Sequence, residues 1–394
     1  MTATSPAFLV VDDNDDNRFT LTRRLAREGY TNLTSAVNGR EALAKLRTEN
    51  FDLVLLDVMM PEMNGYEVLE QMNADARLRE IPVIMISALD QVDSVVRCIE
   101  LGADDYLTKP FNPVLLRARV GASLEKKRLH DQVSASLARL ERELDAARTL
   151  QLGMLPRAFP QWSRTQPVHV HALMEPAREV GGDLYDCFAV DEHTFCFLVG
   201  DVSEKGAPAA MFMARTRSLV RLAVDLCSRL APSECKSPAA IATTVNAELC
   251  QNNDERMFVT LFLGFLDTAS GALTYVNAGH PPPFVLPAAG TIAKLQCAPQ
   301  MPLGVRRAAQ YQDGRITLAA SDLVFVYSDG VPEAMNPAGE LYGFERLAAQ
   351  ITAHSSDLPQ PAVTAVKADV DGFAADAPKA DDVTMLALRW SPEA

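Results

Sequence analysis

In the first third of the chain, short apolar runs alternate with segments whose apolar residues recur at helical spacing. The apolar runs predict strands that are buried on both faces, and the segments between them predict helices. Strands are expected at residues 8–13, 32–36, 53–57, 81–87 and 104–110, and helices at 18–29 and 39–48. Strand and helix in alternation indicate parallel βαβ units. This part of the chain is therefore predicted to be a three-layer, doubly wound α/β domain with a five-stranded parallel sheet.

Residues 123–156 show a different pattern, dominated by charged residues. Their apolar positions are 133, 137, 140, 144 and 147. This four-three spacing is a heptad seam of about two heptads, which predicts a helical linker that pairs with a second copy as a coiled coil. The alternative is one amphipathic helix that lies on its own domain. Gly153 and Pro156 are expected to end the helix.

Beyond residue 157 the alternation of strands and helices is lost. Strands are expected at 195–201, 258–266, 273–278, 323–329 and 383–388, and helices at 209–223 and 238–250. Several of these strands follow one another directly, and Gly271 lies between two of them as a hairpin requires. The pattern predicts antiparallel pairing in an α+β sandwich.

Composition narrows the class of protein. A chain of 394 residues with 48% hydrophobic content is typical of two or three globular domains. No apolar run approaches the roughly 18 residues of a membrane helix, and the N-terminus lacks the regions of a signal peptide, so no membrane association is expected. Seven cysteines without a CxxC pair indicate reduced thiols and a cytoplasmic location. The net charge of −14 argues against binding to nucleic acid and suits a protein that holds divalent cations.

Polar residues stand at the ends of the predicted strands of the first domain: Asp12, Asp13, Asp57, Ser87 and Lys109. The carboxyl ends of parallel strands meet at one edge of a sheet, where ligands bind. Three carboxylates at that edge call for a cation, and an all-oxygen set favours Mg²⁺ or Mn²⁺. Lys109 and Ser87 would hold the oxygens of a phosphoryl group on Asp57. Taken alone, Asp57 fits a turn or N-cap aspartate equally well.

This arrangement resembles the receiver domain of bacterial response regulators over about residues 6–122. The resemblance implies that Asp57 is the phospho-acceptor for a sensor histidine kinase or a small phosphodonor. It implies a Mg²⁺ site formed by the three aspartates and the backbone carbonyl of Met59. It also gives roles to three further residues: Ser87 and Tyr106 as the switch pair, and Lys109 as the contact to the phosphoryl group. The alternatives are a surface aromatic for Tyr106 and a hydroxyl bonded to the backbone for Ser87.

The second half places aspartates beside glycines or at strand ends: Asp183, Asp186, Asp201, Asp329, Asp381 and Asp382. None shows the His/Cys spacing of a zinc site. Each alone would more often be a turn or cap residue, but several in one domain weaken that interpretation. A shared cluster would hold two hard cations, which lower the pKa of a bridging water and clamp an anion for in-line attack. The pattern predicts hydrolysis of a phosphate ester without a protein nucleophile.

With Asn277-Ala-Gly-His280 between them, these motifs resemble the metal-dependent (PPM) serine/threonine phosphatases, and among these the SpoIIE-like branch, over about residues 150–391. The resemblance implies two Mn²⁺ or Mg²⁺ ions held by a set of residues: Asp183, Asp201 as the bridge between both ions, the Val202 carbonyl, Asp329 and Asp381. It also implies contact of Asp186 with a metal-bound water, and a supporting place for Asp382. We expect His280 to be structural. Glu204 stands where the family has glycine, and would either perturb the metal site or point to solvent.

The sequence therefore predicts a receiver domain (1–122), a helical linker (123–156) and a phosphatase domain (157–394). Asp57 phosphorylation is expected to control dephosphorylation of a phosphoserine or phosphothreonine protein, which the resemblance implies is an anti-sigma-factor antagonist. A homodimer is expected. The alternative is a non-catalytic adaptor that binds a partner when Asp57 is phosphorylated. A transcription factor is disfavoured, because the chain is acidic and has no basic recognition helix.

Overall fold

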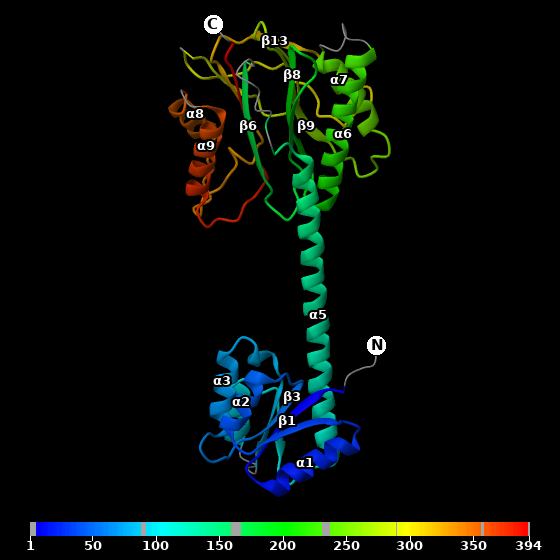
Figure 1. Cartoon of the computed structure of the whole chain (residues 1–394), viewed down its shortest axis with the longest axis vertical. Coiled ribbons are helices and arrows are strands. Elements are labelled where there is room, and N and C mark those ends of the chain that lie inside the picture. Colours follow the sequence, from blue (N-terminus) through cyan, green and yellow to red (C-terminus); the bar gives the residue numbers. More distant parts are fainter. Residues whose placement is uncertain are drawn as a thin grey trace. The chain divides into compact units, whose positions relative to one another are not determined.

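The computed structural model describes residues 5–87, 92–157, 159, 167–230, 237–288, 290–355 and 358–392. The chain divides into two compact units, Met1–Glu141 and Arg142–Ala394. The division falls inside one long helix, α5 (Pro113–Met154) (Figure 1). In the described part of the chain, no helix has a stretch apolar enough to cross a lipid bilayer.

The first unit is built on a parallel sheet with strand order β2-β1-β3-β4-β5. Its strands are β1 (Ala7–Val11), β2 (Asn32–Ala36), β3 (Leu53–Asp57), β4 (Val83–Ser87) and β5 (Asp105–Thr108). Its helical segments before α5 are α1 (Asp15–Arg27), α2 (Gly39–Thr48), α3 (Gly65–Ala74), a 3-10 turn (Leu78–Glu80) and α4 (Val92–Glu100). Separate apolar clusters pack on the two faces of the sheet, which confirms the predicted three-layer α/β fold.

Local sequence directs the chain away from the carboxyl ends of two central strands. Asn14 caps α1 by accepting hydrogen bonds from the backbone N–H groups of Asp16 and Asn17. Asn64 and Glu67 form a capping box at the start of α3. A Cβ atom on Gly65 would lie 2.3 Å from the Asp57 carbonyl oxygen, so a glycine is needed there. These turns leave the strand-end carboxylates facing the sheet edge.

The second unit contains two antiparallel sheets, with strand orders β13-β10-β9-β8-β7 and β12-β11-β14-β15-β6. The first sheet has β7 (Leu184–Ala189), β8 (Thr194–Val202), β9 (Val259–Asp267), β10 (Ala272–Ala278) and β13 (Gly314–Thr317). The second has β6 (Val168–Glu175), β11 (Phe284–Leu286), β12 (Ala293–Lys294), β14 (Leu323–Tyr327) and β15 (Val383–Trp390). Gly271 lies at the β9–β10 turn with φ +72°, as the predicted hairpin requires.

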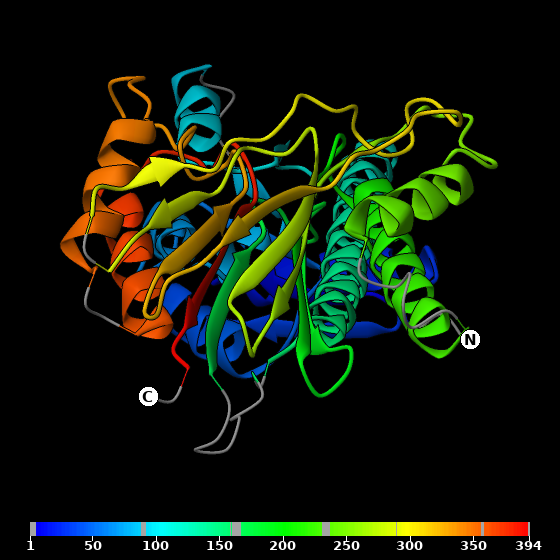
Figure 2. The same cartoon turned by 90° about the horizontal axis from the view of Figure 1, so that it is seen from above.

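Helices cover the outer faces of the two sheets, as Figure 2 shows from above. Helices α6 (Ala207–Leu230) and α7 (Pro238–Leu249) pack on the first sheet. Helices α8 (Phe344–Ala353) and α9 (Pro359–Ala374) pack on the second. Between the sheets lies an aromatic-rich core that includes Phe195, Phe197 and Phe262. The predicted α+β sandwich is confirmed.

Candidate functional site

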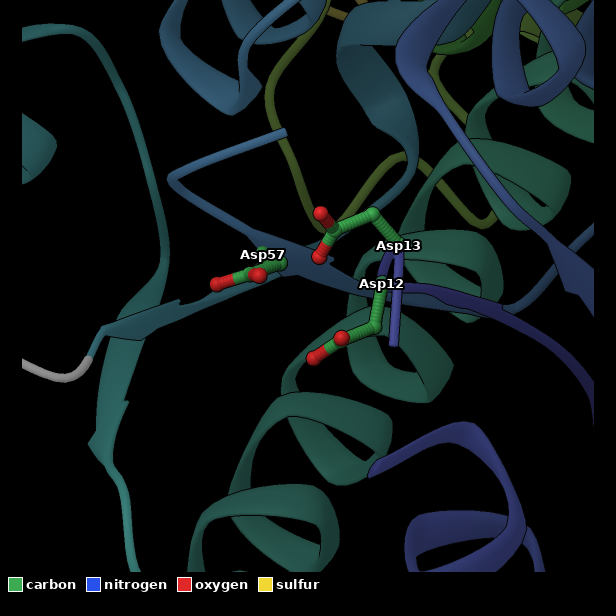
Figure 3. A group of neighbouring side chains, drawn as sticks. All are labelled: Asp12, Asp13 and Asp57. Carbon is green, nitrogen blue, oxygen red and sulfur yellow. The ribbon is translucent and has the colours of Figure 1, made fainter. Parts of the chain in front are cut away.

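The strand-end carboxylates of the first unit lie close together. Asp12, Asp13 and Asp57 each place one oxygen within 4.8 Å of the others, and Figure 3 shows their side chains extending into one space. Asp12 and Asp57 are buried, whereas Asp13 is exposed. The ammonium nitrogen of Lys109 lies 2.9 Å from Oδ2 of Asp12 and 2.9 Å from Oδ2 of Asp57. One lysine thus faces two buried carboxylates.

The electrostatics of this group fit a divalent cation. Burial raises the pKa of Asp57, and the nearby charge of Asp12 raises it further, while the hydrogen bond from Lys109 opposes both effects. Burial lowers the pKa of Lys109, but the hydrogen bonds to Asp12 and Asp57 outweigh it and the net shift is upward. Three carboxylates against one ammonium group leave net negative charge at the sheet edge. Hard oxygen ligands of this kind are those that Mg²⁺ prefers.

The other predicted receiver residues lie on the neighbouring strands. Ser87 is buried at the end of β4, and its carbonyl accepts a hydrogen bond of 2.8 Å from the Lys109 backbone N–H. Tyr106 is partly buried on β5, with the guanidinium of Arg119 5.5 Å from its ring centre. Met59 follows β3 with its side chain 68% exposed. The cluster in contact consists of the aspartates and Lys109, whereas the Tyr106 ring contacts α5.

In the second unit, four aspartates come from the ends of strands in both sheets. Strands β7 and β8 are antiparallel with Leu184 opposite Gly200, so Asp183 stands opposite Asp201. Strands β14 and β15 are antiparallel with Tyr327 opposite Met385. Two further aspartates flank that pair of strands: Asp329 after β14 and Asp381 before β15. Each sheet thus supplies two carboxylates.

The four aspartates are linked by burial and by like charge. Burial raises the pKa of Asp201 to about 8, and the negative charges of Asp329 and Asp381 contribute. Burial raises the pKa of Asp183 well above its usual value, and the charge of Asp201 adds to the shift. Burial also raises the pKa of Asp329, again with help from Asp381. Like charges at short range oppose ionisation unless cations neutralise them.

Two further observations describe the surroundings of these carboxylates. Oδ2 of Asp183 is buried and has no hydrogen-bond partner in the described part of the chain, although such groups are normally satisfied. The ammonium nitrogen of Lys205 lies 2.8 Å from Oδ2 of Asp381. One lysine balances only part of the charge of four carboxylates. Among the described residues, the receiver aspartates are the group whose carboxylate oxygens all lie within 4.8 Å of one another, and the four aspartates of the second unit do not form such a closed set. That these four hold cations stays a prediction.

Asp382 fixes the turn that carries Asp183. Its Oδ1 accepts a hydrogen bond from the Ala177 N–H at 2.7 Å. Its Oδ2 accepts from the N–H groups of Gly182 at 2.6 Å and Asp183 at 3.3 Å. A Cβ atom on Gly181 would lie 2.4 Å from Oδ2 of Asp382, so only glycine permits this approach. The Gly-Gly-Asp sequence is thus explained by the close approach of backbone to a buried carboxylate.

Comparison with known proteins agrees with this geometry. Residues 8–121 match the family model of the response regulator receiver domain. Residues 191–391, just over half of the chain, match the model of Stage II sporulation protein E (SpoIIE). The chain belongs to the SpoIIE family. It consists of a receiver domain joined to a SpoIIE-type domain.

Several known proteins resemble parts of this SpoIIE-family chain. Protein IcfG of Synechocystis is 31% identical over 265 residues, which are 62% of this chain and 41% of IcfG. The alkaline phosphatase synthesis transcriptional regulatory protein PhoP of Bacillus subtilis is 42% identical over 121 residues, 31% of this chain and 49% of PhoP. The chain therefore spans about half the length, or less, of these relatives. The SiaA-PP2C domain of Pseudomonas aeruginosa shares the fold, with a TM-score of 0.57, 21% identity, and coverage of 66% of this chain and all of that domain.

The remaining predicted residues of the SpoIIE-type domain lie around the cluster. Asp186 is fully buried, and both of its oxygens face arginines of α6, Arg217 and Arg221. His280 is buried, with Nδ1 2.9 Å from the Thr260 hydroxyl, and burial lowers its pKa to about 3. A neutral, buried histidine is what a structural role requires.

The side chain of Glu204 is exposed, so the added carboxylate of this chain faces solvent. Its backbone carbonyl packs against the turn before Asp183, 3.2 Å from where a Cβ of Gly182 would stand. The Val202 carbonyl lies on the same side, 3.1 Å from that position.

Sequence reasoning missed three contributors to the site: Gln151, Lys205 and the pair Arg217 and Arg221. The four-residue spacing of the two arginines in the α6 sequence was the one available signal that they share a face. The sequence around Gln151 and Lys205 carried no such signal, because their partners lie 30 and 176 residues further along the chain.

Proposed function

We propose that this chain is a response regulator whose phosphorylation on Asp57 controls the hydrolysis of phosphoserine or phosphothreonine in a partner protein. The observation that carries the proposal is the strand pairing that sets Asp183 opposite Asp201 in one sheet and places Asp329 and Asp381 at the ends of a strand pair in the other, with like charges raising the pKa values of Asp183, Asp201 and Asp329. Divalent cations are the ligands that such a group favours, and hydrolysis by metal-bound water is the chemistry they support. Membership of the SpoIIE family supports the same reaction.

In this proposal the four aspartates and the Val202 carbonyl would hold two Mn²⁺ or Mg²⁺ ions, with Asp201 as a ligand to both. Bound ions would lower the pKa of a water molecule and neutralise the phosphoryl oxygens. The protein keeps the carboxylates in place: Asp382 fixes the turn of Asp183 through backbone N–H groups. Lys205 balances part of the charge at Asp381. Asp186 acts through α6 rather than at the reacting atoms.

The receiver supplies the signal in a separate reaction. A carboxylate oxygen of Asp57 attacks the phosphorus of a phosphohistidine or small phosphodonor, and the donor leaves with the electrons of the broken bond. Mg²⁺ held by the aspartate cluster and the Met59 carbonyl would screen the charge of the incoming phosphoryl group. Lys109, already 2.9 Å from Asp57, holds a phosphoryl oxygen. Ser87 and Tyr106 then respond to the new group.

The proposal extends to the partners of the chain. The resemblance to SpoIIE-like phosphatases favours an anti-sigma-factor antagonist as the phosphorylated substrate, in the cytoplasm. A sensor histidine kinase is the expected phosphodonor. The exposed apolar seam of α5, with Val133, Leu137 and Leu140 each more than half exposed, favours a homodimer.

The test is Mn²⁺-dependent hydrolysis of a phosphoserine peptide by the full chain. We expect Asp201→Asn to lower the rate by at least about 100-fold, because it removes a ligand between two ions. The matched control is Asp225→Asn, which removes an exposed aspartate paired with Arg229 on α6. Equal, low hydrolysis by the wild type and Asp201→Asn, together with binding of a partner, would replace the phosphatase with a non-catalytic adaptor.

A further inference from the structure

Gln151 is a buried amide in the last turn of α5. Only 4% of it is exposed, whereas most of the described side chains in the preceding two turns are exposed. Its Nε2 donates a hydrogen bond of 2.5 Å to the Gly181 carbonyl, and its Oε1 accepts one of 3.1 Å from the Gly181 N–H. The side-chain amide thus pairs with one backbone residue in both directions.

Gly181 belongs to the turn that ends at the metal-binding aspartate. Asp382 holds this turn through the N–H groups of Gly182 and Asp183. Gln151 holds it from α5 through Gly181. The two side chains together satisfy the backbone of three consecutive residues, and the missing Cβ of Gly181 is where Asp382 approaches. A displacement of Gln151 would therefore move the backbone two residues before Asp183.

The end of α5 is itself anchored in the SpoIIE-type domain. Leu155 is 4% exposed and packs in the core between the two sheets. The Tyr185 hydroxyl donates a hydrogen bond of 2.8 Å to the Pro156 carbonyl. At its other end the same helix begins in the receiver, where Leu116 and Val120 pack in the apolar core. One helix thus has buried contacts in both units.

We propose that Gln151 is a positioning residue that couples α5 to the phosphatase site, by setting where Asp183 stands and hence how tightly the site binds its ions. The inference rests on the proposed function, since it takes Asp183 as a metal ligand. It adds the route by which a change in the linker helix reaches that ligand. Residues that orient metal ligands typically change metal affinity by about 10–100-fold when they are replaced.

The test compares Mn²⁺ binding in Gln151→Met and Gln300→Met by calorimetry. Methionine keeps the length of the side chain but makes neither hydrogen bond. Gln300 is a matched control, because its amide pairs with the Gln312 backbone in the same two directions, at 3.1 and 2.7 Å. All proteins carry Asp13→Ala and Asp57→Ala, which removes the receiver carboxylates from the titration.

We expect Gln151→Met to weaken Mn²⁺ binding by about tenfold or more and Gln300→Met to leave it unchanged. Gln151→Glu keeps the acceptor for the Gly181 N–H and loses the donor. It provides a second test in case Gln151→Met does not fold. Its added charge favours cations, so weaker binding in this variant too would reflect lost positioning. Equal Mn²⁺ affinity in wild type, Gln151→Met and Gln151→Glu would overturn the inference.

The readout separates this inference from the proposed function. Calorimetry measures ion binding whether or not the protein hydrolyses a phosphopeptide. A wild type that binds Mn²⁺ but hydrolyses nothing would contradict the phosphatase activity. A loss of affinity confined to the Gln151 variants would still support the positioning role.

Discussion

At the scale of single residues, the raised pKa values of the aspartates in the SpoIIE-type domain make its stability depend on pH. A carboxyl whose pKa is raised on folding binds protons more tightly in the folded state, so its contribution to stability falls as pH rises. For Asp201, with its pKa raised to about 8, most of that loss is present at neutral pH without metal. A side chain that cannot ionise in the unfolded chain should remove this loss of stability.

We therefore predict that Asp201→Asn raises the melting temperature of the metal-free protein by about 2–4 °C, the shift expected for about 1 kcal/mol in a domain of this size. The variant should also lose most of the stabilisation that Mn²⁺ gives the wild type. Thermal unfolding in EDTA and in Mn²⁺ measures both effects. An identical Mn²⁺-induced shift in wild type and variant would remove Asp201 from the ion site.

His280 predicts a pH dependence of the opposite sign. Its pKa is lowered by burial to about 3, so between about pH 6.5 and 3 the unfolded chain binds the extra proton. Its stabilising contribution is complete above pH 6.5 and is lost as pH falls, by about 2 kcal/mol at pH 5. His280→Gln should reduce the difference in unfolding free energy between pH 7.5 and pH 5 by about that amount.

Denaturant unfolding of the SpoIIE-type domain at the two pH values measures this difference. The exposed His193→Gln is the matched control and should retain the full pH dependence. An unchanged pH dependence in His280→Gln would show that the histidine is not held neutral.

The sequence predicted which residues come together more completely for the receiver cluster than for the candidate site of the SpoIIE-type domain. Asp12 and Asp13 follow β1, Asp57 ends β3 and Lys109 follows β5, and the carboxyl ends of these parallel strands lie at one edge of the sheet. The surroundings of Asp183 could not be derived in this way. The partners of its turn come from α5 and from the start of β15, some 30 and 200 residues away along the chain, and the sheet register brings them together.

At the scale of secondary structure, the elements with continuous apolar runs were predicted and several others were missed. β9, β14 and β15 were found, because their residues are almost all buried. β6, with histidines in alternate positions and mixed burial, carries no such run. The long α5 was predicted from its charged heptads alone. The structure shows that it starts at Pro113, inside the part matched by the receiver family.

The seam of α5 gives a prediction for this element. Leu140 is 52% exposed and lies in register with Val133 and Leu137. If two copies pair along this seam, Leu140→Asp buries a charge at the interface and should weaken the dimer strongly. Ala135→Asp, off the seam and also exposed, is the matched control and should not. Light scattering across a concentration series measures the molar mass of both variants. Equal masses for the two variants would eliminate the coiled coil.

At the scale of the whole molecule, the proposed function assigns separate chemistries to carboxylates in separate units. In the receiver, Lys109 pairs with Asp12 and Asp57. In the SpoIIE-type domain, burial and like charge raise the pKa values of Asp183 and Asp201. Helix α5 spans the division between the two units. Coupling between the reactions is therefore expected to depend on this helix.

Insertions into α5 between Glu141 and Arg142, where the units divide, test that dependence. An α-helix turns by about 100° per residue, so seven added residues restore the helical phase to within about 20°, whereas two rotate one end by about 200°. We predict that a small phosphodonor changes the phosphatase rate of the wild type and of the seven-residue insertion by a similar factor. The two-residue insertion should lose this response while it still hydrolyses phosphopeptides. Asp57→Ala, which lacks the phospho-acceptor, is the negative control and should show no response to the phosphodonor. If the two-residue insertion responds as the wild type does, helical phase plays no part, and a flexible or diffusive contact between the units must carry the signal.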